Sequence, residues 1–347
     1  MPKFPRHKIF DLTRLTEIAL VTDREIWSLL VTPMVKSLLG PIQSSRVELR
    51  ETQKGLFPGD DVSNLNGHKL YGKDGFVRYP YLYSLYKTEN GVFTVKRDGV
   101  KFEAFGWYGD VEKGRGELIF KAALRDRRFD GTPQANDCAL VEFIGYEDPA
   151  LNGRLPVDAR SVELSIYGFL PGSSIFDSTG ELEFELFVEK PFQFLDRPQL
   201  FLEYFKRAWE TKRAPGQKAA PIPDVSKLVP PRFEKIAGRR GYDFIEVAPS
   251  HYHVAMWAVS VGYRFTDPVQ ANAMANLAAG IKRIKESGLK LTRSQESWVC
   301  VAQSLPVELI PQGLYLGGPV WPQDNIGPQN LWMNKPLNES ARQLVLR

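Results

Sequence analysis

The alternation of apolar and polar residues between positions 45 and 190 limits the fold more than any other feature of this chain. In "SVELSIYGFL", Val162, Leu164 and Ile166 fall on one side of an extended strand, whereas Glu163 falls on the other. A period of two with one apolar side is typical of an antiparallel sheet that has one covered face. We therefore expect this region to form antiparallel strands.

Turn-forming dipeptides divide this region into hairpins. Asn90-Gly91 and Asp98-Gly99 favour tight turns, because both central residues of such a turn need a positive φ, and the second pair separates "VFTVK" from "VKFEAFGWY". Further strands are expected at "GELIFKAAL", "CALVEFIGY", "SVELSIYGFL" and "ELEFELFVE". Several such strands joined by long loops predict a sandwich, a jelly roll or a barrel.

Helices are expected on both sides of the β-rich region. Residues 10–42 carry an apolar stripe behind Thr22 and Glu25, a pair that matches a capping box, and Pro33 is expected to bend or split this segment. Residues 197–212 predict a second helix with a proline in its first turn.

The last third of the chain predicts a small α+β unit. A helix at 268–287 has Asp267 as its N-cap and Gly288 just past its end. The windows "HVAMWAVSVGYRF" before this helix and "SWVCVAQSL" after it are expected to be strands. Residues 213–232 are rich in proline and alanine and have no periodicity, which predicts a linker.

Together these patterns predict an α+β fold dominated by antiparallel β structure, with a sandwich, jelly-roll or barrel-like body, N-terminal helices and a smaller C-terminal α+β unit. The expected segments are 1–44 (N-terminal helical segment), 45–195 (antiparallel β domain), 196–232 (helix and proline-rich linker), 233–310 (small α+β unit) and 311–347 (extended tail).

The composition indicates which class of protein this is and where in the cell it is expected. An apolar share of 43% and a charged share of 25% are typical of a globular protein in solution. No stretch approaches the roughly 20 apolar residues of a membrane span, and the start of the chain lacks the apolar core of a secretory signal. Cys138 and Cys300 do not suggest a disulfide framework. We expect the protein in the cytoplasm or in an assembled particle, without a cofactor.

His251 and His253 in "SHYHVAMW" are the only closely spaced histidines. On a strand they would share one face, and two imidazoles so placed can ligate zinc or iron. The apolar window that follows indicates a covered strand instead, with histidines that serve as hydrogen-bonded core residues. We therefore expect no metal at these two weak candidates.

Basic and aromatic residues suggest nucleic acid as a second partner. Residues 191–347 carry 20 Lys and Arg against 13 Asp and Glu, although the net charge of the whole chain is only +4. Residues 69–87 interleave tyrosines with cations, as single-strand binders do, although alternating tyrosines also fit one packed face of a strand. The candidate residues are Lys69, Lys73, Arg78, Tyr79, Tyr81, Tyr83, Arg239, Arg240, Lys282, Arg283 and Lys285.

The segment 311–338 has no helical or strand period, yet it is too apolar for a disordered tail. An extended segment with large apolar anchors needs a surface, which is either its own domain or a neighbouring subunit. We expect the second, with Trp321, Leu331, Trp332 and Met333 anchoring assembly.

No catalytic motif accompanies these features: the chain has no G-x-S-x-G, H-E-x-x-H, paired C-x-x-C, P-loop or Rossmann glycine pattern. The favoured function is a non-enzymatic, self-assembling structural subunit, capsid- or shell-like, that forms a homo-oligomer. The alternatives are a nucleic-acid-binding subunit of a larger complex and an enzyme with a β-barrel or sandwich pocket.

Overall fold

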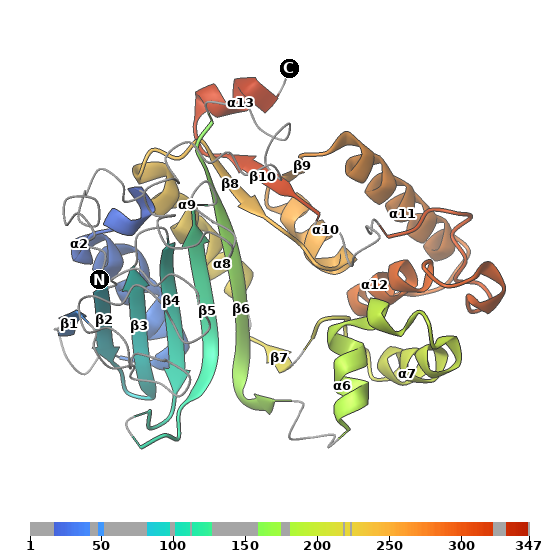
Figure 1. Cartoon of the computed structure of the whole chain (residues 1–347), viewed down its shortest axis with the longest axis horizontal. Helices are drawn as coiled ribbons and strands as arrows, with labels where there is room; N and C mark the ends of the chain where they lie inside the picture. Colours follow the sequence, from blue (N-terminus) through green and yellow to red (C-terminus); the bar gives the residue numbers. More distant parts are fainter. Residues whose placement is uncertain are drawn as a thin grey trace, which may run out of the picture. The chain divides into compact units, whose positions relative to one another are not determined.

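The computed structural model describes residues 17–41, 48–51, 82–97, 101–111, 113–126, 159–174, 181–217, 219–222, 224–321 and 331–345 (Figure 1). The chain folds into two compact units, each assembled from stretches that are far apart in the sequence. Unit 1 comprises residues 1–172, 221–245 and 336–347, and unit 2 comprises residues 173–220 and 246–335. These units do not follow the five segments expected from the sequence.

Unit 1 is built on an open antiparallel sheet in which six strands follow one another in chain order. They are β1 (Glu48–Glu51), β2 (Leu82–Lys87), β3 (Gly91–Arg97), β4 (Lys101–Tyr108), β5 (Glu117–Arg125) and β6 (Ser161–Ser174). In the strand order β8 (Phe244–Val247) follows β6, and β7 (Ala219–Pro221) pairs with β6. The expected α+β fold with a large antiparallel sheet is confirmed; among the described strands neither a sandwich nor a barrel is formed.

The hairpins expected from the turn dipeptides are present. Strands β2 and β3 pair so that Tyr86 stands opposite Phe93, and the turn between them is closed by a hydrogen bond from the Thr88 amide to the Gly91 carbonyl, 2.9 Å long. Strands β3 and β4 pair in the same way, with Val95 opposite Ala104.

The two faces of this sheet differ in chemistry. One face is almost entirely apolar, and its fully or nearly buried members are Ser84, Tyr86, Phe93, Val95, Arg97, Phe102, Ala104, Phe120, Ala122, Leu124 and Leu164. The opposite face carries cross-strand ion pairs, Lys121 with Glu103 at 3.3 Å and Arg125 with Glu163 at 3.2 Å. Apart from Arg97, the ion-paired charges of these strands lie on the face opposite the apolar one.

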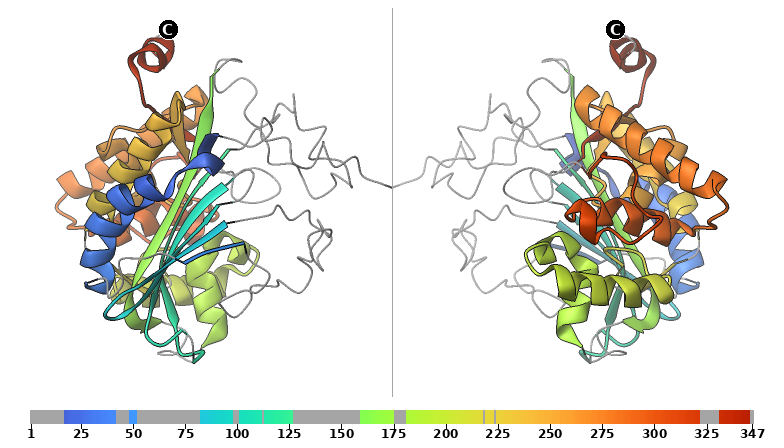
Figure 2. Two further views of the ribbon diagram at one scale, coloured as in Figure 1. Left: turned by 90° about the vertical axis from the view of Figure 1, so that its left-hand side faces the viewer. Right: turned by 90° about the vertical axis from the view of Figure 1, so that its right-hand side faces the viewer.

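Helices of unit 1 lie along the apolar face, as Figure 2 shows. They are η2 (Glu17–Leu20), α2 (Asp23–Glu25), η3 (Ile26–Val35), α3 (Lys36–Leu39), α8 (Val225–Leu228) and α9 (Pro230–Arg239), with α13 (Glu339–Val345) near the end of the chain. The ring of Phe233 on α9 meets the ring of Phe102 on β4 edge-on, with centroids 5.9 Å apart. This contact joins the helical layer to the sheet.

The N-terminal helices begin as their sequence predicts. Thr22 and Glu25 form the expected capping box, in which each side chain accepts a hydrogen bond from the other residue's amide. The break expected at Pro33 is absent, since helical structure continues from Asp23 to Leu39. Pro33 lies within the π-helical stretch η3, whose wider turns accommodate a residue that has no amide donor.

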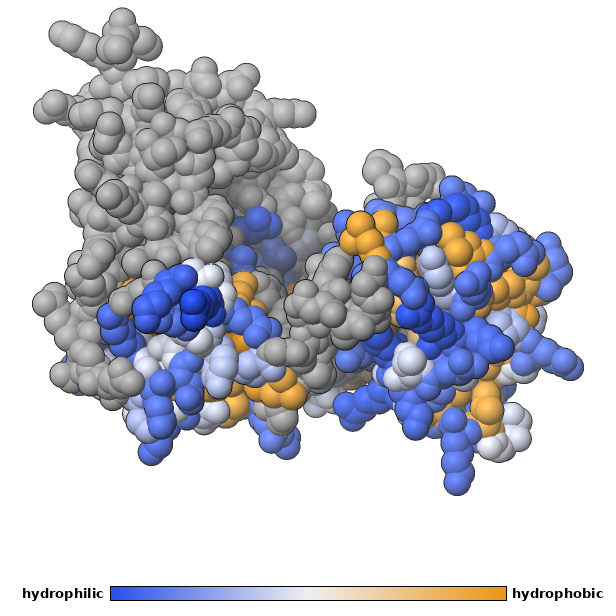
Figure 3. Space-filling view, turned by 90° about the horizontal axis from the view of Figure 1, so that it is seen from below, coloured by the Kyte–Doolittle hydropathy of each residue, from blue (hydrophilic) through white to orange (hydrophobic). Residues whose placement is uncertain are grey.

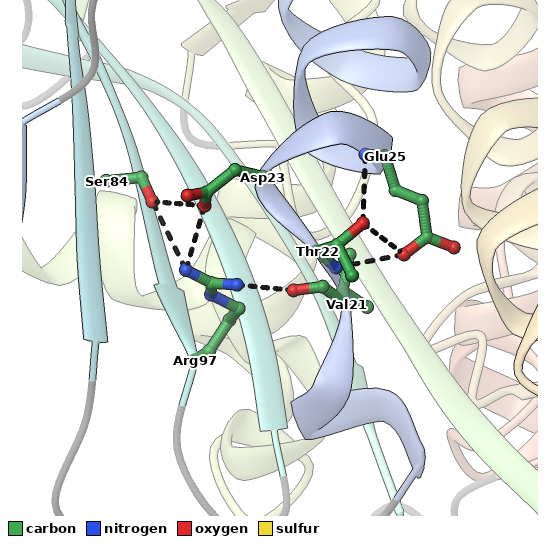
Figure 4. Close-up of polar contacts among 6 residues, drawn as sticks. All are labelled: Val21, Thr22, Asp23, Glu25, Ser84 and Arg97. Atoms are coloured by element: carbon green, nitrogen blue, oxygen red, sulfur yellow. Dashed lines mark hydrogen bonds and ion pairs between the residues drawn. The ribbon is translucent and has the colours of Figure 1, made fainter.

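Arg97 at the end of β3 fastens these helices to the sheet (Figure 4). Its guanidinium donates to the Val21 carbonyl, to the Asp23 carboxylate at 3.0 Å and to the Ser84 hydroxyl oxygen at 3.5 Å. Because Arg97 is only 8% exposed, these acceptors take the place of water around a buried charge.

A second tether passes through Tyr242. Its hydroxyl donates to the fully buried Asp126 carboxylate at 2.9 Å and accepts from the Ile18 amide at 3.2 Å. One phenol thus links three segments of unit 1.

Unit 2 is mainly helical. Its elements are α6 (Leu182–Glu189), η5 (Pro191–Phe194), α7 (Pro198–Glu210), α10 (Tyr252–Ser260), β9 (Arg264–Phe265), α11 (Pro268–Glu286), α12 (Arg293–Ala302), η6 (Val307–Leu309) and β10 (Met333–Pro336). Helix α11 begins as expected, with the Asp267 side chain accepting from the Val269 amide at 2.7 Å. Helix α7 confirms the helix expected at 197–212.

Three stretches expected to be strands are helices instead: "ELEFELFVE" forms α6, "HVAMWAVSV" lies in α10 and "SWVCVAQSL" lies in α12. In α12 every residue from Ser297 to Ala302 is buried, so its sequence carries no helical period. Thr292 and Gln295 form a capping box that could have marked its start. The stretch expected to be a linker, 213–232, contains β7, α8 and the start of α9, and the chain passes from unit 2 to unit 1 within it.

The core of unit 2 is aromatic. Phe187 on α6 stacks on Trp298 of α12 with ring centroids 5.2 Å apart, and it meets Phe194 and Phe201 edge-on. Beside this cluster Arg213 and Glu185 form a buried bidentate ion pair, which joins the end of α7 to α6.

Candidate functional site

Helices α10, α11 and α12 of unit 2 border a hollow of about 390 Å³, which falls in the usual size range of small-ligand pockets. Its floor is apolar and its rim carries charge. The residues that line it are Tyr252, Ala278, Ile281, Lys282, Lys285, Glu286 and Glu296. The spacing of three and four residues along α11 places five of these side chains on one helix face.

Two ion pairs flank the hollow. Lys285 on α11 contacts Glu296 on α12 at 2.8 Å, and Lys282 contacts Glu286 one turn later on α11 at 3.7 Å. Glu296 is the most enclosed of these charges, with 17% of its side chain exposed, whereas both members of the second pair stand largely in solvent. The rim therefore carries two cations and two anions, with one half-buried carboxylate.

Tyr252, the first residue of α10, contributes a phenol to the lining of the hollow. Only 5% of Tyr252 is exposed, and its hydroxyl makes no hydrogen bond with any other described residue. Burial raises the pKa of this phenol, and Cys300 and Glu296 nearby raise it further. The hydroxyl is therefore protonated at neutral pH and is able both to donate and to accept.

The histidine pair lies at the start of the same helix rather than on a strand. His251 is the N-cap of α10 and His253 is in its first turn, with parallel rings whose centroids are 6.1 Å apart. Phe192 stacks on the other side of His251 at 6.3 Å, and Trp321 stacks on Phe192 at 6.5 Å. His251 is buried and His253 is partly buried, in a helix rather than in the expected strand.

Both imidazoles are neutral at physiological pH. Burial, together with the neighbouring His253, lowers the pKa of His251 to about 3, and burial lowers the pKa of His253 to about 4. His253 Nδ1 lies 3.1 Å from the Ser297 hydroxyl, whereas the buried Nδ1 of His251 has no hydrogen-bond partner.

The serine–histidine contact resembles a nucleophile and its base. Ser297 is fully buried in α12, so no substrate reaches it, and the contact is best understood as a packed hydrogen bond. Among the described residues no three His, Cys, Asp or Glu side chains converge as metal ligands would. The expectation that no metal binds at His251 and His253 stays a prediction.

The four residues expected to anchor assembly are buried within their own unit. Trp321 is 2% exposed and Leu331 and Met333 are fully buried, while Trp332 is 8% exposed. The Trp332 amide donates to the Gln270 side chain at 3.3 Å, and Met333 begins strand β10, which pairs with β9. Their role in assembly stays a prediction.

The candidate nucleic-acid residues belong to different parts of the chain. Lys69, Lys73, Arg78, Tyr79 and Tyr81 lie outside the described residues, and Tyr83 lies in β2. Arg239 and Arg240 belong to unit 1, whereas Lys282, Arg283 and Lys285 belong to unit 2.

Four of these cations already have partners within the chain. Arg240 pairs with Glu25, Lys285 pairs with Glu296 and Lys282 pairs with Glu286. Arg283 donates to the Leu316 carbonyl at 2.9 Å. Nucleic-acid binding stays a prediction.

Comparison with known protein families, with curated proteins and with solved structures finds no match to this chain. No helix within the described ranges is long and apolar enough to cross a membrane. The site is therefore interpreted from its own chemistry.

Sequence reasoning missed the hollow, because its residues come from three helices and form no local motif. The one available signal was on α11, where Ala278, Lys282 and Glu286 recur at four-residue intervals.

Proposed function

We propose that the protein is a non-enzymatic structural subunit that associates with copies of itself. The observation that supports this most is on α6, a helix with apolar side chains on two opposite sides. Phe184, Phe187 and Val188 point into unit 2 and are buried, whereas Leu182 is 69% exposed and Leu186 is 38% exposed.

Helix α6 also carries Glu183, Glu185 and Glu189, yet it keeps two leucines exposed on the side away from its buried face. Leu182 and Leu186 are four residues apart and so form one stripe along the outer side of α6. Figure 3 shows hydrophobic residues scattered among hydrophilic ones on a face of unit 2. A second copy of the chain would supply a matching stripe, as two-fold interfaces do.

The use of polar side chains in the described residues supports a structural rather than a catalytic role. Arg97, Arg213 and Tyr242 are buried groups that could serve chemistry, yet each joins segments that are distant in the sequence. A catalytic side chain needs a polar atom that can reach the substrate.

Light scattering after size-exclusion chromatography tests the proposal. We expect the native chain to elute as an oligomer and the double substitution Leu182→Lys, Leu186→Lys to elute as a monomer with unchanged circular dichroism. The matched control is Val269→Lys, Val307→Lys, which introduces the same charge at positions that are 76% and 58% exposed elsewhere in unit 2. A monomeric native chain, or an oligomer that survives the α6 substitutions, would overturn the proposal.

A further inference from the structure

The helices that cover the sheet of unit 1 present a basic outer surface, which self-association through α6 does not require. The exposed charged side chains of segments 17–39 and 224–240 are five cations and one anion, namely Arg24, Lys36, Lys227, Lys235, Arg239 and Asp224. Asp224 pairs with Lys227 at 2.7 Å. The other four cations form no ion pair with any described residue, so this surface carries a net positive charge.

Arg24 and Arg239 lie at the same end of this basic surface. Helices η3 and α9 are neighbours on the apolar side of the sheet (Figure 2), and Arg240 at the end of α9 pairs with Glu25 of α2. Each member of that pair directly follows one of the two unpaired arginines in the chain. The pair is neutral as a whole, and its side chains are only 21% and 14% exposed. It therefore leaves the charge of Arg24 and Arg239 uncompensated.

The basic surface is elongated. On the N-terminal helices Arg24, Ser28, Thr32 and Lys36 recur at four-residue intervals, and all four are exposed. At about 1.5 Å per residue this row is at most about 18 Å long. Over that length one strand of a nucleic-acid duplex presents about five phosphates, at roughly 3.4 Å each.

Gly238 opens the neighbouring helix to close approach. It is exposed on α9 between Lys235 and Arg239, and a Cβ added there would meet no atom within 4 Å. Its φ is not in the left-handed region either, so neither packing nor backbone conformation requires a glycine. A glycine inside a helix lowers stability relative to alanine. What it provides here is a stretch of helix backbone that a partner can approach closely, with a cation on either side.

The side chains of this surface suit a phosphate backbone. Arginine, lysine and exposed backbone are the usual contacts to nucleic-acid phosphates. A single strand is normally held by aromatic side chains as well, and a membrane surface by apolar side chains that enter the bilayer. The row from Arg24 to Lys36 and the exposed side of α9 at Lys235 and Arg239 contain neither kind.

The exposed apolar residues of the N-terminal helices lie outside this row. Leu20 belongs to η2, before the row begins. Trp27 packs on Tyr86 of β2 with ring centroids 6.1 Å apart, and it is two residues from Glu25, which faces α9. Residues two apart on a helix do not share a face. We infer that the basic surface binds the backbone of double-stranded nucleic acid without regard to sequence.

Fluorescence anisotropy of a labelled DNA duplex, titrated with the full chain at several salt concentrations, tests this inference. Four neutralised phosphates give a slope of about −3.6 in log affinity against log salt. The affinity should therefore fall about 100-fold between about 50 and 200 mM salt. Two duplexes of equal length and unrelated sequence should bind equally well.

A double substitution locates the surface. Arg24→Gln, Arg239→Gln removes two of the four unpaired cations and should weaken binding about tenfold or more at about 50 mM salt. With two phosphate contacts left, the fall over the same salt range should shrink to about tenfold. The matched control is Arg264→Gln, Arg293→Gln, which removes two exposed arginines of unit 2 and should bind like the native chain.

The inference is overturned if the duplex does not bind at about 50 mM salt, or if the Arg24 and Arg239 variant, with an unchanged melting temperature, binds as the native chain does. An equal loss in the control variant would also overturn it. Tighter binding of a single strand of the same length, or of vesicles that contain phosphatidylserine, would identify a different partner and contradict it. The basic surface belongs to unit 1 and the α6 stripe to unit 2, so a failure here leaves the test of self-association unaffected.

Discussion

Lowering the pH from 8 to 5 is expected to destabilise unit 2 through the buried His251 and the partly buried His253. In the folded chain the pKa of His251 is lowered to about 3 and that of His253 to about 4, because burial disfavours the imidazolium ion. In the unfolded chain both return to the ordinary histidine pKa of about 6.5. The unfolded state therefore binds more protons as the pH falls through 6.5, and stability decreases with it.

The size of this effect follows from the two shifts. At pH 5 each histidine is almost fully protonated in the unfolded chain and almost fully neutral in the folded one. Each therefore lowers the free energy of unfolding by about 2 kcal/mol relative to pH 8, and the pair lowers it by about 4 kcal/mol. Unfolding at pH 5 should take up about two protons, whereas at pH 8 the histidines contribute almost nothing.

Urea unfolding followed by tryptophan fluorescence at pH 5, 6, 7 and 8 measures this loss. Five of the seven tryptophans belong to unit 2, so fluorescence reports chiefly on that unit. The matched variant is His251→Phe, His253→Gln, which keeps a ring in the stack and a hydrogen-bonding group toward Ser297 but cannot titrate. Carboxylates titrate equally in both proteins, so the difference between them isolates the histidines. If the native chain and the variant lose the same stability between pH 8 and pH 5, the reasoning is refuted.

Three further predictions concern tethers and the tail. Arg97→Met should lower the free energy of unfolding by about 1–3 kcal/mol, because the Val21 carbonyl loses a buried donor, and thermal denaturation measures the loss. Tyr242→Phe should cost a similar amount, since the buried Asp126 carboxylate loses a donor; a change below about 0.5 kcal/mol would contradict the tether. Truncation after Pro311 should abolish cooperative unfolding of unit 2 in circular dichroism, whereas a cooperative transition retained in the truncated chain would show that the tail is dispensable.

The parts of the fold that local chemistry determines could be predicted from the sequence. The capping residue Thr22 and the N-cap Asp267 begin helices as expected, and the alternation in β6 assigns Val162 and Leu164 to a buried face. Local signals failed where a helix is surrounded on all sides. In α12 no polar face marks a period, and in α6 two apolar sides imitate the alternation of a strand.

The candidate site could not be predicted, because it depends on tertiary packing. In the sequence, Tyr252 lies next to a run of apolar residues and nothing marks it as part of a site. The packing of α10 against α12 is what brings it near Glu296. The packing partner of the tail, residues 311–338, could not be predicted from local sequence either. Its apolar anchors were recognised, but nothing local distinguishes a surface of the same chain from a surface of another copy.

Sedimentation velocity of the unmodified protein over a dilution series tests self-association most directly. The chain has a mass of 39.3 kDa, and the account predicts a larger species at high concentration that dissociates toward this mass on dilution. The double lysine variant of α6 should sediment as the 39.3 kDa chain throughout. A native protein that sediments at the mass of one chain at every concentration would contradict the claim that it is an assembly subunit.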